Sequence, residues 1–355
     1  MKLTLEATVQ GIKPIKEEWR KRARERLDNL IIPPGSLGEL LNIAERLAAI
    51  QETLKPSVRY KAVVTMAGDH GVVEEGVSNF PQEVTPQMVA NFVSGGAGIN
   101  VLAEVAGAQV IVVDMGVAAD LSDLVKTGKI LSYKIGYGTK NIAREPAMTR
   151  EQAISSIEAG IEIASTLVEK GVELLGTGDM GIGNTTPSSA ILAALSGLPV
   201  AEVTGRGTGI SEEAWRNKVR VIERALELHK PDPRDPIDVL AKVGGFEIGG
   251  IAGLILGAAY HRVPVVIDGF ISSAGALLAQ GLAPSCVDYM FAGHLSKEPG
   301  HKFMLQRLGL KPLLNLDLRL GEGTGAALAM NIIEAAAQVI GKMLTFEEAG
   351  VSRSK

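Results

Sequence analysis

Glycine stands beside an acid or a histidine after each of six short apolar runs. The six segments are Gly68–Gly71, Asp114–Gly116, Gly176–Gly181, Asp268-Gly269, Gly293-His294 and Gly321–Gly323. In an open parallel sheet, ligands bind beyond the carboxyl ends of the strands, where glycine lets the backbone approach a ligand and a short polar side chain can reach it. One such pair would be an ordinary turn, but six in register predict a single deep polar site.

The segment Gly176–Thr186 has the composition of a phosphate-binding loop. Backbone N–H groups freed by glycine, with Asn184 and two threonines at a helix start, can donate to an anion that the helix dipole also favours. The segment also fits G-x-G-x-x-G, with Glu202 about where a dinucleotide fold places its ribose-binding acid. Against a dinucleotide site, the segment lies mid-chain, Asp179 stands among the glycines, and Pro187 interrupts the expected first helical turn.

A second glycine-rich loop, Thr204–Gly209, precedes a helical stretch that carries Lys218 between Arg216 and Arg220. Positive charge near a glycine loop suits a phosphate. The alternative is a flexible turn followed by a solvated helix of mixed charge, and for Lys218 alone this alternative is the better interpretation.

Glu322 lies within Leu320–Gly325, immediately before a long apolar stretch. It could be a helix-start carboxylate that interacts with the helix dipole. In an apolar, glycine-walled pocket, burial would instead raise its pKa and make it a general base near neutral pH. Spacing alone leaves both interpretations open.

The stretch Ser78–Met88 combines an aromatic ring, a thioether and amide groups on what we expect to be irregular chain. Phe80 and Met88 could form the apolar walls of a site for a flat heteroaromatic ligand, with Gln87 as its polar contact. Equally, it could be a proline-rich connection whose phenylalanine fills the core.

Composition limits the class of protein. The 355 residues allow one large domain and a smaller one, and 46% hydrophobic residues with 4% aromatics and 41 glycines favour an α/β fold of closely packed helices. A net charge of −4 with interspersed signs predicts no nucleic-acid partner. The single cysteine, Cys286, fits a reducing compartment, and no segment resembles a signal or a membrane span, so we expect a cytoplasmic protein.

Short apolar runs alternate with helical segments along most of the chain, which predicts a doubly wound, Rossmann-like, mostly parallel sheet. The expected strands are 62–66, 110–113, 172–175, 263–267, 287–291 and 313–316. The main expected helices are 12–50 with a break at 33–35, 151–169, 188–195, 211–228, 236–242, 247–260, 272–279 and 324–343.

Several catalytic patterns are absent from the sequence. There is no GxxxxGK[ST] loop and no HExxH, and the five histidines are scattered without metal-ligand spacing. No pair of adjacent acids ends a strand ahead of a threonine-rich loop, as a phosphoribosyl-diphosphate enzyme would require. We therefore expect no metal and no cofactor.

Taken together, these motifs resemble the nicotinate-nucleotide:dimethylbenzimidazole phosphoribosyltransferase family over nearly the whole chain. The matching segments, in order, are Pro33–Gly38, Gly68–Gly71, Pro81–Thr85, Gly178–Thr186, Val203–Gly209, Gly244–Ile248, Val265–Phe270, Gly293-His294 and Leu320–Gly325. The resemblance implies transfer of a phosphoribosyl group from nicotinate mononucleotide to dimethylbenzimidazole or a related base, a step of cobalamin nucleotide-loop assembly.

The resemblance also implies site residues and an architecture. Glu322 matches the catalytic base, and Asp179 an auxiliary acid. The implied nucleotide- and phosphate-binding residues are Gly178, Gly181, Gly183, Asn184, Gly205, Gly207 and Lys218, and the implied base-binding residues are Ser78, Phe80 and Gln87. From their residue types alone we add Thr185 to the first set and Met88 to the second. It implies a large α/β domain, 59–323, a small helical domain from 1–58 plus 324–355, and a homodimer. The alternatives are a nicotinamide-dinucleotide oxidoreductase and a non-catalytic nucleotide-binding protein.

Overall fold

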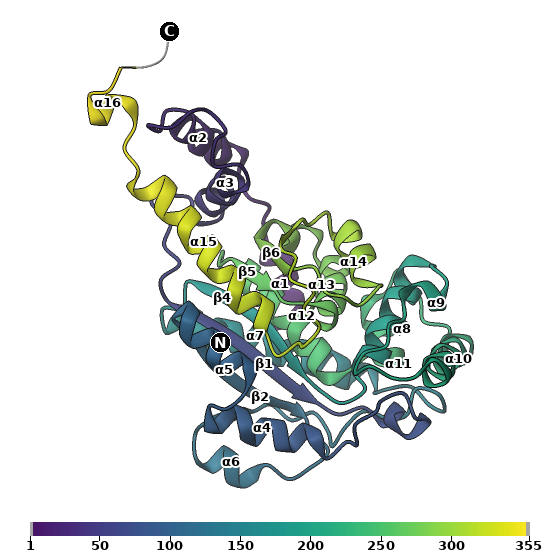
Figure 1. Cartoon of the computed structure of the whole chain (residues 1–355). Coiled ribbons are helices and arrows are strands. Elements are labelled where there is room, and N and C mark those ends of the chain that lie inside the picture. The colour runs from purple at the N-terminus through teal and green to yellow at the C-terminus, as the bar shows by residue number, and fades with distance from the viewer. Residues whose placement is uncertain (1–2, 353–355) are drawn as a thin grey trace.

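The computed structural model describes residues 3–352, and its centre is a seven-stranded, wholly parallel sheet (Figure 1). The strands are β1 (Lys61–Gly68), β2 (Ala108–Gly116), β3 (Ile130–Ser132), β4 (Leu174–Met180), β5 (Val265–Ile267), β6 (Met290–His294) and β7 (Pro312–Leu314). Their order is β3-β2-β1-β4-β5-β6-β7, so the direction of winding reverses between β1 and β4. Such a reversal opens a crevice at the carboxyl ends of the two strands. The predicted doubly wound α/β fold is confirmed.

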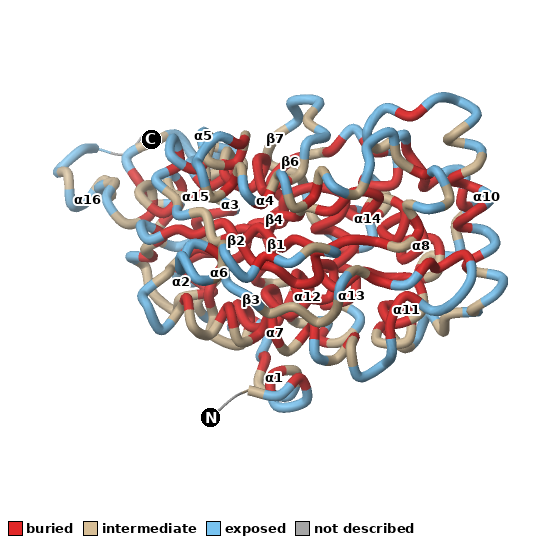
Figure 2. The backbone as a smooth tube through the Cα atoms, turned by 90° about the horizontal axis from the view of Figure 1, so that it is seen from below, coloured by how far each residue is buried: buried red, intermediate tan, exposed pale blue. Residues whose placement is uncertain are grey.

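Helices cover both faces of the sheet, with α7, α12 and α13 on one side and α5 and α15 on the other (Figure 2). The α-helices are α1 (Leu5–Gly11), α2 (Glu17–Leu27), α3 (Glu39–Gln51), α4 (Val84–Ser94), α5 (Gly98–Ala106), α6 (Ser122–Lys126), α7 (Arg150–Glu169), α8 (Thr185–Ser196), α9 (Val200–Val203), α10 (Glu212–His229), α11 (Pro236–Val243), α12 (Phe246–Tyr260), α13 (Phe270–Leu282), α14 (His301–Leu308), α15 (Thr324–Lys342) and α16 (Phe346–Ala349). Two 3₁₀ helices are η1 (Gly71–Glu75) and η2 (Pro284–Tyr289).

Glycine allows α7 and α12 to approach each other more closely than side chains would permit. A Cβ on Gly253 would lie 1.8 Å from the Ile157 carbonyl oxygen, and one on Gly160 would lie 2.0 Å from the Gly250 carbonyl oxygen. Every residue of α12 from Phe246 to Ala259 is buried. Because glycines stand where the two helices meet, α7 and α12 pack with their backbones in direct contact.

The sequence prediction missed some elements. Strand β3 and helices α4, α5 and α14 were not expected, and the predicted strand 287–291 lies in η2 as far as Tyr289, so that β6 begins only at Met290. The stretch 78–88 is not wholly irregular, because α4 begins at Val84. Pro187 lies in the first turn of α8, where proline costs no backbone hydrogen bond, so interpreting it as an interruption of that turn was wrong. Pro86 lies in the same position of α4.

Helices α2 and α3 lie beside α15 at one end of the molecule (Figure 1). Their buried residues belong to the same continuous core as those of the sheet. The division into 59–323 and a helical domain from the two chain ends stays a prediction.

Two described segments are long and apolar enough, by length and composition alone, to cross a membrane: 84–106 and 324–342. The first is not a single helix, because Gly95, with φ 82°, ends α4 before α5 begins at Gly98. The second is α15, which packs against β4, β5 and β6 as a core helix does.

Candidate active site

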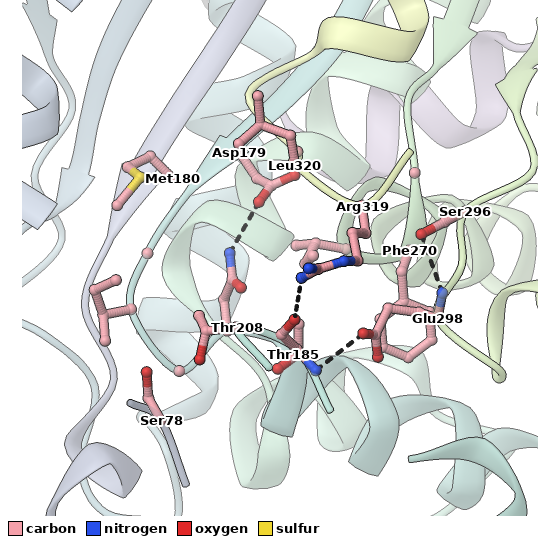
Figure 3. A pocket seen from close by; sticks show the side chains of 18 of the residues that line it. Ser78, Asp179, Met180, Thr185, Thr208, Phe270, Ser296, Glu298, Arg319 and Leu320 are labelled. Carbon is pink, nitrogen blue, oxygen red and sulfur yellow. Dashed lines mark hydrogen bonds between the residues drawn. The ribbon is translucent and has the colours of Figure 1, made fainter. Parts of the chain in front are cut away.

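A cavity of about 270 Å³ lies at the carboxyl ends of β4 and β6, where the glycine-rich segments converge (Figure 3). Ser78 and Met180 lie at one end, and Glu298 and Arg319 at the other. Phe80, whose N–H donates to Ser78 Oγ, belongs to the first end, and Gly207, whose N–H donates to Glu298, to the second; Leu320 and Thr185 also line the cavity. Further lining residues include Asp179, Gly181, Gly183, Asn184, Phe270, His294 and Ser296. Four of the six glycine segments thus line the cavity, through Asp179, Gly269, His294 and Gly321, whereas Gly68–Gly71 and Asp114–Gly116 do not.

Asp179 lies near the carboxyl end of β4, on the cavity wall, and is almost fully buried. Its Oδ2 accepts a hydrogen bond from Asn184 Nδ2 at 2.9 Å, and its Oδ1 has no protein partner. Burial, reinforced by the nearby charge of Asp268, raises the pKa of the Asp179 carboxyl well above its ordinary value. This side chain can therefore carry a proton at a pH where a solvated aspartate could not.

Asp268 follows β5 and binds the start of α15. Its oxygens accept from the N–H groups of Gly323 and Ala326, at 3.2 and 3.0 Å. His294 Nε2 lies 3.8 Å from Asp268 Oδ1, and both side chains are buried. Burial raises the pKa of Asp268, although the histidine and the helix start oppose that rise.

Glu322 has a positive φ angle, which is uncommon for a residue other than glycine, and so do the glycines on either side of it. Gly321, Glu322 and Gly323 have φ values of 86°, 64° and 99°. The Glu322 carbonyl accepts from Thr65 Oγ1 on β1 at 2.8 Å and lies against Gly178 on β4, where a Cβ would come within 2.3 Å of it. The turn therefore sits over the reversal between β1 and β4.

The Glu322 side chain is 5% exposed, and its Oε2 accepts from the Ile99 N–H at 3.0 Å. Ile99 lies in the first turn of α5, so this carboxylate interacts with the start of α5 and not with that of α15, as the helix-start interpretation supposed. Burial raises the pKa of Glu322, with a smaller contribution from Asp268. A buried carboxylate with a raised pKa, next to cavity-lining Gly321, is competent as a general base.

Lys218 lies behind the opposite end of the cavity and is fully buried. Its Nζ donates to Thr185 Oγ1 at 2.6 Å. Burial lowers the pKa of this lysine to about 8, while the charge of Glu298 acts in the other direction. The interpretation of Lys218 as part of a solvated helix face is therefore wrong.

Gly207 lies between this cavity and a second one of about 650 Å³, and both its N–H and its carbonyl group make hydrogen bonds to side chains. Its N–H donates to Glu298 Oε1 at 3.0 Å, and its carbonyl accepts from Arg319 Nη1 at 3.3 Å. Glu298 and Arg319 line both cavities, as Gly207 does. Burial raises the pKa of Glu298, and the charge of Lys218 partly offsets that rise.

A fully buried histidine–glutamate pair supports the loop after β4. His70 Nε2 lies 2.7 Å from Glu247 Oε1, and a Cβ on Gly181 would lie 3.4 Å from the same His70 nitrogen. The charge of Glu247 raises the pKa of His70 although burial, the largest single effect, opposes that rise. The Gly68–Gly71 turn thus contributes behind the cavity wall.

The predicted site residues divide into those on the cavity wall and those around it. The wall includes Ser78, Phe80, Asp179, Gly181, Gly183, Asn184, Thr185 and Gly207. Gly178 lies beneath the Glu322 turn, Gly205 lines the second cavity, and Lys218 reaches the wall through Thr185. Gln87 and Met88 lie on α4 outside the wall, with Gln87 exposed.

Arg319, Glu298 and Ser296 were not singled out from the sequence. Ser296 and Glu298 follow the Gly293-His294 pair by a few residues, and Arg319 directly precedes Leu320–Gly325. Extending each glycine-rich segment by about five residues would have found all three.

Among residues 3–352, no group of three or more His, Cys, Asp or Glu side chains is arranged to hold a metal ion. Of the acids near β4 and β5, Asp179 lines the cavity, whereas Asp268 and Glu322 are buried beside it. At the opposite end the wall includes Thr185 and Arg319, and buried Lys218 lies behind Thr185.

Residues 12–351 match a family described as Phosphoribosyltransferase (DBI_PRT). The chain is 60% identical over 351 residues to the nicotinate-nucleotide--dimethylbenzimidazole phosphoribosyltransferase of Syntrophotalea carbinolica, with 99% of each chain covered. It is 58% identical over 352 residues to the protein of the same name from Geobacter sulfurreducens, again with 99% of each covered. The crystal structure of CobT from Thermus thermophilus superposes with a TM-score of 0.91 at 50% identity, over 95% of this chain and all of that one.

Proposed function

The chain belongs to this family of phosphoribosyltransferases, and we propose that it transfers the phosphoribosyl group of nicotinate mononucleotide to 5,6-dimethylbenzimidazole or a related base. The products are α-ribazole 5′-phosphate and nicotinate, as cobalamin nucleotide-loop assembly requires. The comparisons lend no support to a nicotinamide-dinucleotide oxidoreductase.

The observation that carries the proposal is Glu322, a buried carboxylate with a raised pKa beside a cavity whose far end is backed by the buried Lys218. In the proposed reaction, one ring nitrogen of the benzimidazole attacks the anomeric carbon while Glu322 accepts the proton from the other ring nitrogen. The bond to the nicotinate nitrogen breaks, and its electron pair neutralises the pyridinium charge. Attack from the face opposite the leaving group converts the β-linkage into the α-linkage.

The two ends of the cavity suit the two parts of this reaction. Gly207, Thr185, Lys218 and Arg319 supply donors for the 5′-phosphate. Ser78, Phe80, Met180 and Leu320 offer a mixed apolar surface for the flat acceptor base. The carboxyl groups of Asp179 and Asp268 lie on the side of the cavity proposed for the ribose, where their oxygens can stabilise the developing positive charge. The protein then supplies proximity, orientation and a base without a cofactor.

The decisive experiment incubates the full chain with nicotinate mononucleotide and dimethylbenzimidazole and separates the products by chromatography. We expect equal amounts of nicotinate and α-ribazole 5′-phosphate. Release of no nicotinate with any benzimidazole or related acceptor would overturn the proposal. Binding of the mononucleotide without turnover would favour the non-catalytic alternative.

We also propose a homodimer in the cytoplasm, with no nucleic acid or membrane as partner. The segment 84–106 supports the dimer, since only 28% of its most apolar window is buried, and Val101 and Val105 on α5 are 57% and 69% exposed. A V105D substitution should shift the mass measured by light scattering from two chains to one. An unchanged mass would remove α5 from the interface.

A further inference from the structure

Glu298 holds a backbone donor in the part of the cavity where the proposed function puts a phosphate. Its Oε1 accepts from the Gly207 N–H at 3.0 Å, and its Oε2 has no protein partner. The residue is 8% exposed and lines both cavities. Figure 3 shows Glu298, Arg319 and Thr185 gathered at the same end of the site.

The surroundings of Glu298 are those of a bound anion. Lys218 and Arg319 both act on its charge, and its amide N–H donates to Ser296 Oγ at 3.3 Å. A Cβ on Gly205 would lie 2.0 Å from Oε2, so the glycine-rich loop leaves room for this carboxylate. The glycine-rich loop thus binds the Glu298 carboxylate with a backbone N–H and nearby positive charge, the same kinds of contact that bind phosphate.

A backbone N–H offers one donor, so it cannot make a short hydrogen bond to two anions at once. A phosphate beside an ionised Glu298 would also meet like-charge repulsion. Binding of a phosphate at Gly207 therefore requires Glu298 to release this N–H.

We propose that Glu298 is a specificity-determining residue that competes with the ligand phosphate for the Gly207 N–H. This inference rests on the proposed function for the position of the phosphate. Inorganic phosphate and short phosphate esters gain only the contacts at this end of the cavity. A nucleotide gains further contacts along the ribose and ring, and these offset the displacement of Glu298.

The test is calorimetric titration of the full chain with inorganic phosphate and with ribose 5-phosphate, in the wild type and in Glu298→Gln. A pH of about 6.5 keeps Lys218 protonated, since its pKa is about 8. Gln retains the side-chain shape and removes the charge, and neutral hydrogen bonds are roughly half as strong as charged ones. We expect both probes to bind about tenfold more tightly to the variant. Equal or weaker binding overturns the proposal.

Glu212→Gln is the matched control. Glu212 lines the second cavity and not the first, and its side chain pairs with Arg206 and Arg216, whereas the side-chain partners of Gly207 are Glu298 and Arg319. Its substitution removes the same unit of charge nearby and should change phosphate affinity by less than about twofold. A gain equal to that of Glu298→Gln would overturn the proposal, because it would indicate a general charge effect.

A second variant guards against misfolding of the first. Glu298→Ala removes both the charge and the acceptor and should also tighten phosphate binding, whereas weaker binding in every folded Glu298 variant would contradict competition. These titrations need neither acceptor base nor turnover. If Glu298→Gln tightens phosphate binding but the wild type releases no nicotinate, the proposed function fails and the competition stands. If the wild type releases nicotinate but Glu298→Gln does not tighten phosphate binding, the proposed function stands and the competition fails.

Discussion

The two ends of the cavity differ in the charged groups that they bury: carboxyl groups alone at one end, and at the other Lys218 together with Glu298. Near β4 and β5, Asp179 and Asp268 lie close enough that the charge of Asp268 raises the pKa of both Asp179 and Glu322. At the other end Lys218 is buried with a neutral hydroxyl as its hydrogen-bond partner, and its pKa falls to about 8. The acid end therefore favours binding a proton or facing a cation, and the lysine end favours an anion. The proposed donor substrate carries both charges, a pyridinium ring and a phosphate.

The largest expected effect is at the acid end, where Glu322→Gln should lower kcat by about 10²–10⁴-fold. Gln can still accept from the Ile99 N–H but cannot take a proton. Nucleotide affinity, measured by titration, should stay within about twofold of the wild type because the phosphate lies at the other end. Turnover that persists at the wild-type rate would remove Glu322 as the base.

The pH profile sharpens the same assignment. Because burial raises the pKa of Glu322, the deprotonated base should be lost at a higher pH than for a solvated glutamate as the solution is acidified. The acid limb of kcat should therefore lie above the ordinary glutamate range. In Glu322→Gln the residual rate should lack that limb.

At the lysine end, Lys218→Met should raise the KM for nicotinate mononucleotide by about 10–100-fold with a smaller change in kcat. Met fills similar space without the charge. In the wild type the same KM should rise as the pH passes about 8, where Lys218 loses its proton, and the variant should lack that rise.

The stability of Lys218→Met serves as its control. A lysine whose pKa is lowered in the folded state costs stability at neutral pH, and this cost disappears only as the pH rises through its folded and then its unfolded pKa. The variant should therefore melt no more than about 2 °C below the wild type. A much lower melting temperature would make the KM change a folding effect.

Asp179→Asn should have an intermediate effect, with kcat lowered by about tenfold. Because the pKa of Asp179 is raised in the folded protein, its ionised form destabilises the fold at neutral pH, and that cost fades as the pH falls through the folded pKa. The variant should melt about 2–4 °C higher at neutral pH and gain less on acidification. A loss as large as that of Glu322→Gln would give Asp179 an equal share in the chemistry.

The smallest expected effect is that of Phe80→Ala, which should raise the KM for the acceptor base about threefold and leave that for the nucleotide unchanged. Phe80 is 50% exposed at the mouth of the cavity, so thermal stability should not change. Equal changes in both KM values would contradict the assignment of this end to the base.

The fold was predictable where periodicity and composition agree. Helix α12 follows its predicted range closely, because an apolar run rich in Gly and Ala can be buried on all sides. The short strand β3 and the helix α4 were missed, since three residues give little pattern and the stretch 78–88 was interpreted as irregular chain.

The site was partly predictable for a related reason. Gly176–Gly181 and Gly321–Gly323 stand out because glycine clusters are rare within regular elements. Glu298 and Arg319 have unremarkable neighbours in the sequence, and their roles depend on contacts with Gly207, which lies about a hundred residues away and joins them only in the folded chain. Likewise, the burial of Lys218 depends on what α10 packs against.

The left-handed turn at 321–323 limits how this acid could be transplanted. The direction of the Glu322 side chain depends on the positive φ angles of residues 321–323, and on the space beside Gly178 that the Glu322 carbonyl group occupies. The rotamer of the side chain is secondary to both. A designer who grafted the glutamate alone onto another scaffold would obtain a side chain of the right chemistry in the wrong place. The transferable unit is the glycine-flanked turn together with the strand surface on which it rests.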